Sequence, residues 1–244
     1  MRREIRQNHG QVLAVLVIAA AASATVAGPV SAQTMDDHIY TYVAFDELEY
    51  AHGLEERPVE YDGQAWIGVD YNRLWVNVRG EHSTLETAGG FEAEALYSRT
   101  ATAYWNLQGG PSVEHHYGSG DAATRGLLAA GVQGLAPYWF EVESFLYVSH
   151  HGDVSARLEA SYEFLFTQRL ALEPEVEVRL AVQDVPDFGV ASGLDQLELA
   201  ARLRYEIVRE FAPYVGISWA RDRSPLAAGA VSDASFVAGL RWWY

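Results

Sequence analysis

The sequence predicts an all-β fold: a closed antiparallel transmembrane β-barrel of about 12 strands, with about 10 as the alternative. Three observations favour this class. Long stretches alternate between apolar and polar residues, no apolar stretch after residue 32 is long enough for a membrane helix, and the final segment is an amphipathic strand that ends on an aromatic residue. A chain of 244 residues with 49% hydrophobic residues can form one such barrel.

The N-terminal residues are predicted to form a cleaved secretory signal peptide, residues 1–32. Several arginines give a positive start, residues 12–27 are an apolar run, and Val30-Ser31-Ala32 supplies small residues for a cleavage site. The alternative is an uncleaved membrane anchor, but the apolar run is shorter than the roughly 20 residues of a spanning helix. We therefore expect residues 33–244 to form a barrel domain that is exported to the outer membrane of a Gram-negative cell.

The alternation with a period of two is clearest in residues 170–182. There the even positions are apolar, from Leu170 to Val182, while most odd positions carry Glu or Arg. Residues 156–166 and 197–206 repeat the pattern. Since successive side chains of a strand point to opposite faces, each stretch has one apolar and one charged face. Such runs exceed the ~5–6 residues of a typical soluble strand and match the ~9–11 residues that cross a bilayer.

The joints between the expected strands also alternate. Brief turns follow the even-numbered strands, and most other joints are longer and richer in Gly, His, Asp and Pro, as expected for short periplasmic turns and longer outer loops. Aromatic residues at both ends of the apolar face predict interfacial girdles. The strands are expected at roughly 38–51, 63–70, 73–81, 91–98, 101–108, 124–135, 138–149, 154–166, 169–182, 194–207, 211–221 and 234–244.

The final segment gives the sharpest signal for a barrel. Phe236, Ala238, Leu240, Trp242 and Tyr244 share one face of the last expected strand. Barrel-assembly machinery accepts a terminal amphipathic strand of this kind, so we expect this machinery and outer-membrane lipid among the partners. Closure of the barrel would also remove the exposed edges of an open sheet. The alternative is a soluble β domain that ends this way by chance.

The charge and the missing residue types exclude several functions. The formal net charge is -16, and every basic residue is Arg. An acidic chain is a poor partner for nucleic acid, whereas it suits cations or simply a solvated surface. The chain has no Cys, which excludes disulfides, thiolate metal sites and Cys nucleophiles. We find no nucleophile elbow, triad spacing or phosphate loop, and we expect no enzymatic activity.

Several segments resemble a known family. The stretch Phe45-Asp46-Glu47-Leu48-Glu49-Tyr50 resembles the opening motif of the copper resistance protein B family. Residues 65–75 (AWIGVDYNRLW) and 131–143 (GVQGLAPYWFEVE) are similar to two further segments of that family. Shorter matches follow in order as far as Phe236-Val237-Ala238-Gly239, so the resemblance covers nearly all of the expected barrel.

The resemblance implies an outer-membrane protein of copper resistance and homeostasis. Such a protein would bind copper ions or assist their passage or sequestration, and a periplasmic multicopper oxidase would be a possible partner. Family members often carry a Met-, His- and Asp-rich segment before the barrel. This sequence departs from the family there, because Met35 is the only Met after residue 32 and the thioether ligands that suit Cu(I) are missing. The alternatives are a narrow solute pore or structural barrel without metal specificity, and a binding or adhesion module built on the outer loops.

Two groups of residues are candidate metal ligands. Asp46, Glu47 and Glu49 could bind a cation near the start of the barrel, or could simply face the lumen. A second group consists of histidines in outer loops or at strand tips. Imidazole is a suitable ligand for Cu(II) or Zn. Alternatively, the strand tips do not converge, and the histidines share no metal ion. These rim histidines are His52, His82, His115, His116, His150 and His151.

A third group is expected to line the lumen. Its functional interpretation is a cation path or a carboxylate site. The alternative is a ladder of Glu–Arg pairs that fills a narrow barrel, because a buried charge without a partner is costly. From the phase of the strands we expect these side chains inside: Glu92, Glu94, Glu141, Glu143, Glu159, Glu163, Glu177, Arg79, Arg157, Arg169, Arg179, Arg202 and Arg204.

Overall fold

The computed structural model describes residues 38–53, 58–85, 88–118, 122–223 and 230–244. The expected signal peptide lies outside the described residues and stays a prediction. No helix in the described part of the chain is long and apolar enough to span a membrane. The only helical segments described there are two short 3-10 turns, Pro137–Trp139 and Pro186–Phe188.

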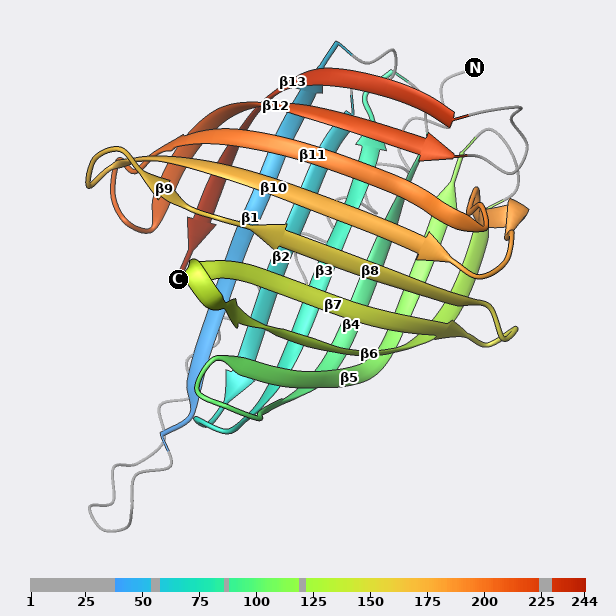
Figure 1. The fold of residues 1–244 in the computed structure, drawn as a ribbon, viewed down its shortest axis with the longest axis horizontal. Helices are drawn as coiled ribbons and strands as arrows, with labels where there is room; N and C mark the ends of the chain where they lie inside the picture. The colour runs from blue at the N-terminus through green and yellow to red at the C-terminus, as the bar shows by residue number, and fades with distance from the viewer. Residues whose placement is uncertain (1–37, 54–57, 86–87, 119–121, 224–229) are drawn as a thin grey trace, which may run out of the picture. The chain divides into compact units, whose positions relative to one another are not determined.

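The described chain is a single antiparallel sheet that closes into a barrel (Figure 1). Strands β8 and β9 pair with successive parts of β10 and share one position, so the barrel has 12 strand positions, as predicted. The strands are β1 (Tyr40–His52), β2 (Pro58–Gly68), β3 (Asn72–Ser83), β4 (Gly89–Thr100), β5 (Trp105–Tyr117), β6 (Ala123–Ala136), β7 (Phe140–Ser149), β8 (Val154–Ser161), β9 (Phe164–Leu165), β10 (Leu170–Ala181), β11 (Gly193–Tyr205), β12 (Phe211–Arg223) and β13 (Ala230–Trp243).

Each strand pairs with its neighbours in sequence, and β1 pairs with β13 to complete the ring. At this seam the backbone N–H of Val43 donates to the carbonyl of Tyr244 at 3.0 Å, and the N–H of Tyr244 donates to the carbonyl of Val43 at 2.8 Å. In Figure 1 the strands in front cross those behind at an angle, as the tilt of strands in a barrel requires. The start of β1 and the end of β13 lie at the same end of the barrel, because they pair with each other. We call this the inner end, as the sequence predicts for the two ends of the strand order, and the opposite end the outer end.

The outer wall is apolar and the lumen is filled with side chains. Large hydrophobic residues such as Leu74, Leu146 and Ile217 are exposed on the outer wall, where lipid surrounds an outer-membrane barrel. Inside, an apolar cluster is buried between β3, β4, β6 and β7. It consists of Trp75, Leu96, Ala129, Phe145 and Tyr147, with Trp66 and Leu127 packed against it.

Strand β1 contains a β-bulge at Asp46, which explains why its sequence alternates poorly. Phe45 lies opposite Gly63 of β2, but Glu47 lies opposite Asp62, so Asp46 is an extra residue. A bulge of this kind changes which face the following side chains occupy. As a result, Asp46 and Glu47 both contact lumenal arginines, although they are adjacent in sequence.

The predicted limits of the fifth strand were wrong. We expected residues 101–108, whereas β5 covers Trp105–Tyr117 and a tight turn precedes it, with the N–H of Ala101 bonded to the carbonyl of Trp105 at 2.9 Å. The Gly109-Gly110-Pro111 segment lies beyond the end of the expected strand, yet it is part of β5. A Cβ at Gly110 would fall 2.0 Å from the carbonyl oxygen of Ala95, so glycine is required for this close strand approach.

The expected strand over residues 154–166 is interrupted between β8 and β9. Its partner β10 contains Pro174, which accepts a hydrogen bond from the N–H of Tyr162 at 3.1 Å but has no N–H to return. The missing donor breaks the ladder at this point. The aromatic residues Tyr162 and Phe164 still lie together, with ring centroids 4.4 Å apart.

Candidate functional site

The candidate site is the charged lumen. There, charged side chains from strands that are not neighbours contact one another across the inside of the barrel. Arg157 of β8 pairs with Glu92 of β4 at 3.2 Å and lies 3.7 Å from Glu94. The hydroxyl of Tyr147 donates to Glu94 at 2.8 Å, and the amide of Asn77 donates to Glu94 at 3.2 Å. The guanidinium of Arg157 also lies over the ring of Tyr147, so this group joins the apolar cluster to the charges.

A second set of contacts surrounds Arg79 of β3. Its guanidinium lies 3.5 Å from Asp62 of β2, 3.6 Å from Glu159 of β8 and 4.0 Å from Glu177 of β10. Glu177 is bound in turn by Arg179 at 2.5 Å. These contacts connect opposite walls of the barrel and fill the space between them.

The third set is centred on Arg202 of β11. Its guanidinium contacts Glu47 at 2.8 Å, Glu175 at 3.0 Å and Glu49 at 3.1 Å. Arg202 is 5% exposed and Glu49 is 2% exposed, so these charges are removed from solvent. Buried charges are tolerated only when they are paired and hydrogen-bonded, as they are here.

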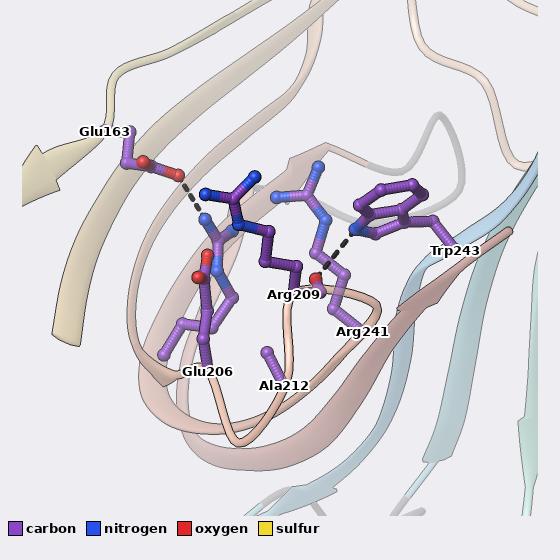
Figure 2. Close-up of a pocket in the computed structure, with 7 residues that line it drawn as sticks. Glu163, Glu206, Arg209, Ala212, Arg241 and Trp243 are labelled. Carbon is purple, nitrogen blue, oxygen red and sulfur yellow. Dashed lines mark hydrogen bonds and ion pairs between the residues drawn. The ribbon is translucent and has the colours of Figure 1, made fainter. Parts of the chain in front are cut away.

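The inner end of the lumen holds a polar cavity of about 210 Å³ (Figure 2). In its wall, Arg241 pairs with Asp46 at 3.2 Å, and Arg204 pairs with Glu173 at 2.5 Å and with Glu163. The indole N–H of Trp243 donates to the carbonyl of Arg209 at 2.8 Å and ties the last strand to the β11–β12 turn. The cavity is lined by Glu163, Arg204, Glu206, Arg209, Ala212, Arg241 and Trp243.

Carboxylates outnumber the arginines that neutralise them, and the surplus is greatest toward the outer end. Glu49, Glu60 and Glu81 lie directly opposite one another on β1, β2 and β3. Glu198 accepts a hydrogen bond from Ser218 at 2.8 Å. Among the described residues of the outer half, several carboxylates make no ion pair, including Glu60, Glu81, Glu198 and Asp222.

Three further residues that were expected in the lumen lie on β7 or in the turn before β10. Glu143 accepts a hydrogen bond from Gln133 at 2.5 Å. Glu141 lies on the same face of β7 near the inner end, and among the described residues it makes no ion pair. Arg169 lies in the exposed turn before β10, where its N–H donates to the Thr167 hydroxyl, and is not part of the lumenal wall.

The rim histidines do not come together. His52 is exposed at the end of β1, and His82 and His115 contact Tyr117 and Thr124 at 3.1 and 2.7 Å. His116 is bound to Glu114 at 2.8 Å, while the neighbouring His150 and His151 of the β7–β8 turn have tilted rings with centroids 3.8 Å apart. In the parts of the chain that the structure describes, no group of three or more His, Asp or Glu has the arrangement of a metal site.

Sequence reasoning missed several residues of the lumenal network. Glu173 and Glu175 have the same phase as Glu177 along β10, so the alternation could have identified them. Asp62 and Arg241 also belong to the network, but their strands carry few charges and gave a weaker signal.

A carboxyl group in the β7–β8 turn, outside the membrane-spanning strands, has a shifted pKa. The hydroxyl of Ser149 donates to Asp153 at 2.8 Å in the β7–β8 turn, and Gln183 donates a second hydrogen bond. These bonds lower the pKa of Asp153 below its ordinary value, the Ser149 bond being the larger cause. The turn is therefore stabilised by the ionised carboxylate.

The fold and the apolar outer wall define the chain as an outer-membrane β-barrel protein. A solved structure of the NanC porin has the same fold, with a TM-score of 0.51 and 14% identity over 83% of this chain and 99% of that chain. The chain belongs to the copper resistance protein B family. The sequence model of that family, described as copper resistance protein B precursor, matches residues 39–244.

Two relatives support this assignment. Copper resistance protein B of Escherichia coli is 36% identical over 215 residues, which is 86% of this chain and 71% of the relative. The copper resistance protein B homolog of Pseudomonas syringae pv. tomato is 34% identical over 218 residues, covering 87% of this chain and 72% of the relative. The chain is thus an outer-membrane barrel of a family linked to copper resistance.

Proposed function

We propose that this protein binds copper ions in its acidic lumen and assists their passage or sequestration at the outer membrane. The observation that carries the proposal is the surplus of lumenal carboxylates toward the outer end, where Glu60, Glu81, Glu198 and Asp222 have no cationic partner among the described residues. A low-dielectric wall lined by one sign of charge concentrates ions of the opposite sign. Membership of the copper resistance protein B family supports copper as the ion.

The geometry favours capture over free diffusion. The outer half would collect cations, whereas the ion pairs of Arg79, Arg157 and Arg202 fill the middle of the lumen. An ion that moves inward would have to displace these guanidinium groups from their carboxylates. Passage would therefore be slow and dependent on rearrangement of side chains, which separates this function from that of an open pore.

A binding role is preferred to catalysis. The Ser149 and His150 pair does not form a nucleophile and base, since the Ser149 hydroxyl donates to Asp153 and His150 contacts the backbone of Gly126. We further propose that the barrel-assembly machinery inserts the chain. A periplasmic multicopper oxidase would be its partner at the inner end.

The test is calorimetric titration of the refolded barrel in detergent with Cu(II), Cu(I) and Zn(II). We expect copper binding that weakens in the double variant Glu60→Gln/Glu198→Gln. The matched control is Glu210→Gln, which removes an exposed carboxylate from the β11–β12 turn. Replacement of the six rim histidines tests the other candidate ligands. Absence of copper binding by the wild type would contradict the proposal and assign the copper chemistry to a partner protein.

The second candidate function is a closed structural barrel without metal specificity. It is favoured by the same ion pairs, because such a network rigidifies a lumen as well as it attracts ions. Conductance in a planar bilayer, together with the copper titration, separates the candidates. A structural barrel would show neither conductance nor copper binding.

A further inference from the structure

The β10–β11 loop forms a compact hairpin at the outer end of the barrel. Residues 182–192 connect the two strands there (Figure 1). Val185 and Val190 exchange two backbone hydrogen bonds, with N···O distances of 2.8 and 3.2 Å. Between them Pro186–Phe188 form the short 3-10 turn, and Gly189 reverses the chain with a φ of +71°, a conformation that favours glycine. The tip of the hairpin is therefore shaped by its own backbone.

Side chains at the base of the hairpin fix its direction. Asp184 accepts a hydrogen bond from the N–H of Ser192 at 2.6 Å, and Asp195 accepts one from the N–H of Ala191 at 2.6 Å. Gln183 donates two further hydrogen bonds to the β7–β8 turn. Surface loops are usually the most mobile parts of a fold, but contacts of this kind hold a loop in one arrangement.

The tip places Phe188 on the lumenal faces of β5 and β6. Its ring meets the ring of His116 edge-on, with centroids 5.6 Å apart, and the guanidinium of Arg125 lies 4.4 Å from the Phe188 centroid. A cation over an aromatic face is attracted by the ring electrons. Because β7 and β8 separate β6 from β10 in the sheet, the loop extends over part of the outer mouth, the opening of the lumen at the outer end.

The surface under Phe188 is held together by one carboxylate. Glu114 binds Arg125 at 2.7 Å and His116 at 2.8 Å, so it fixes both side chains that Phe188 contacts. Arg125 is 6% exposed, although it lies only three residues from the outer end of β6. A charged side chain at an open mouth would be in contact with water. The burial of Arg125 therefore indicates that the ring of Phe188 covers it.

We propose that the β10–β11 loop is a lid over the outer mouth, and that Phe188, packed on Arg125 and His116, closes the lumen beside β5 and β6 to solutes from outside. The lid opens when the ring leaves Arg125, which exposes Glu114 and, further inward on the same face of β5, Ser112. This inference goes beyond the proposed function, because the lid controls entry for any small hydrophilic solute and does not require that copper binds.

The test measures access to a reporter beneath the lid. The chain has no Cys, so Ser112→Cys introduces a single thiol at a buried lumenal position two residues inward from Glu114. The probe is a cationic, water-soluble methanethiosulfonate, and its rate of reaction with the thiol is measured on the refolded barrel in detergent. We expect Phe188→Ala to raise this rate at least about tenfold, because loss of the ring contact shifts the lid toward its open state.

Matched controls separate opening of the lid from loosening of the barrel. Phe188→Tyr keeps the ring and should leave the rate low, and Asp187→Ala alters an exposed residue of the same tip and should have no effect. Ala212→Cys reports from the inner cavity instead, and its rate should not respond to Phe188→Ala. A rise of equal size at both thiols would overturn the proposal, since the whole barrel would then have loosened.

A second variant approaches the same contact from the opposite wall. Arg125→Met removes the cation under the ring, so it should also raise the rate at Ser112→Cys, and it decides the test if Phe188→Ala does not fold. Heat-modifiable electrophoretic mobility verifies folding of each variant. Equal rates at Ser112→Cys in the parent and in the folded lid variants would overturn the proposal. The copper titration does not enter this test, so failure of the lid and failure of the proposed function are distinguishable.

Discussion

Two sides of the lumen are closed in different ways. Between β3, β4, β6 and β7 the interior is filled by apolar side chains, with Leu96 and Phe145 almost completely buried. Between β1, β10 and β11 it is filled by charges, with Arg202 bound to three carboxylates. The apolar side is held by packing, which no ion can replace. The charged side is held by ion pairs, so its contribution to stability depends on each charge keeping its partner.

Arg157 connects the two sides. Its guanidinium lies over the rings of Phe145 and Tyr147, with centroid distances of 5.8 and 5.3 Å, while it pairs with Glu92 and Glu94. A cation over an aromatic face is attracted by the ring electrons, and the same charge satisfies the carboxylates. A substitution at Arg157 therefore affects the apolar side and the charged side together.

The largest expected effect follows from Arg157→Met. The substitution leaves Glu92 and Glu94 buried without their cation, which costs about 3–5 kcal/mol of unfolding free energy. Urea unfolding of the barrel in detergent, followed by tryptophan fluorescence, measures the loss. Arg221→Met, at an exposed position of β12, is the control and should change stability by less than about 0.5 kcal/mol. Equal losses of unfolding free energy in the two variants would show that the lumenal ion pairs of Arg157 stabilise the barrel no more than an exposed arginine does.

A smaller effect is expected on the apolar side. Phe145→Leu shortens a side chain that is 1% exposed and leaves a small cavity, which costs about 1–2 kcal/mol. The adjacent Leu146 is 59% exposed on the lipid-facing wall, so Leu146→Met should be nearly neutral. Urea unfolding measures both changes, and the loss in Phe145→Leu should not depend on ionic strength. A loss in Phe145→Leu that changed with salt would contradict the distinction between packing and charge.

The barrel could be predicted because, in the most regular strands, the alternation of apolar and charged residues shows which face each side chain occupies. In residues 170–179 of β10 and 197–205 of β11 the alternation is regular, and the residue phase there placed Glu177 and Arg202 on the charged face. The bulge at Asp46 could not be read in the same way, because a bulge is defined by the register of the partner strands. Nor could alternation show that Gly109-Gly110-Pro111 lies within β5.

The pairing inside the lumen was also beyond sequence reasoning. Arg157 and Glu92 are 65 residues apart, and their contact depends on how the barrel curves and closes. The rim histidines were a plausible metal cluster from their positions at strand ends, yet His82 and His115 contact Tyr117 and Thr124 instead of one another. Loop geometry decides whether such side chains converge, and the sequence does not specify it.

A modest effect of opposite sign is expected at the outer end of the charged side. Glu60 lies between Glu49 and Glu81 in the cross-strand row, and like charges directly opposite each other are destabilising. Glu60→Gln should therefore leave stability unchanged or raise it by up to about 1 kcal/mol, with the gain shrinking as salt is added. Urea unfolding at low and high ionic strength measures this. Destabilisation by Glu60→Gln would mean that Glu60 has a cationic partner in solution.

The smallest expected effect concerns the β7–β8 turn at the outer end, which lies outside both the apolar and the charged side of the lumen. Because the Ser149 hydrogen bond lowers the pKa of Asp153, the ionised carboxylate stabilises the folded turn above the ordinary pKa of Asp. That contribution is lost as the pH falls through the lowered pKa of the folded state. Ser149→Ala should return the pKa of Asp153 toward its ordinary value, and Gln183→Ala should shift it less in the same direction. A carbon-detected NMR titration of the Asp153 carboxyl in detergent measures both shifts, and an unchanged pKa in Ser149→Ala would show that the hydrogen bond is not its cause.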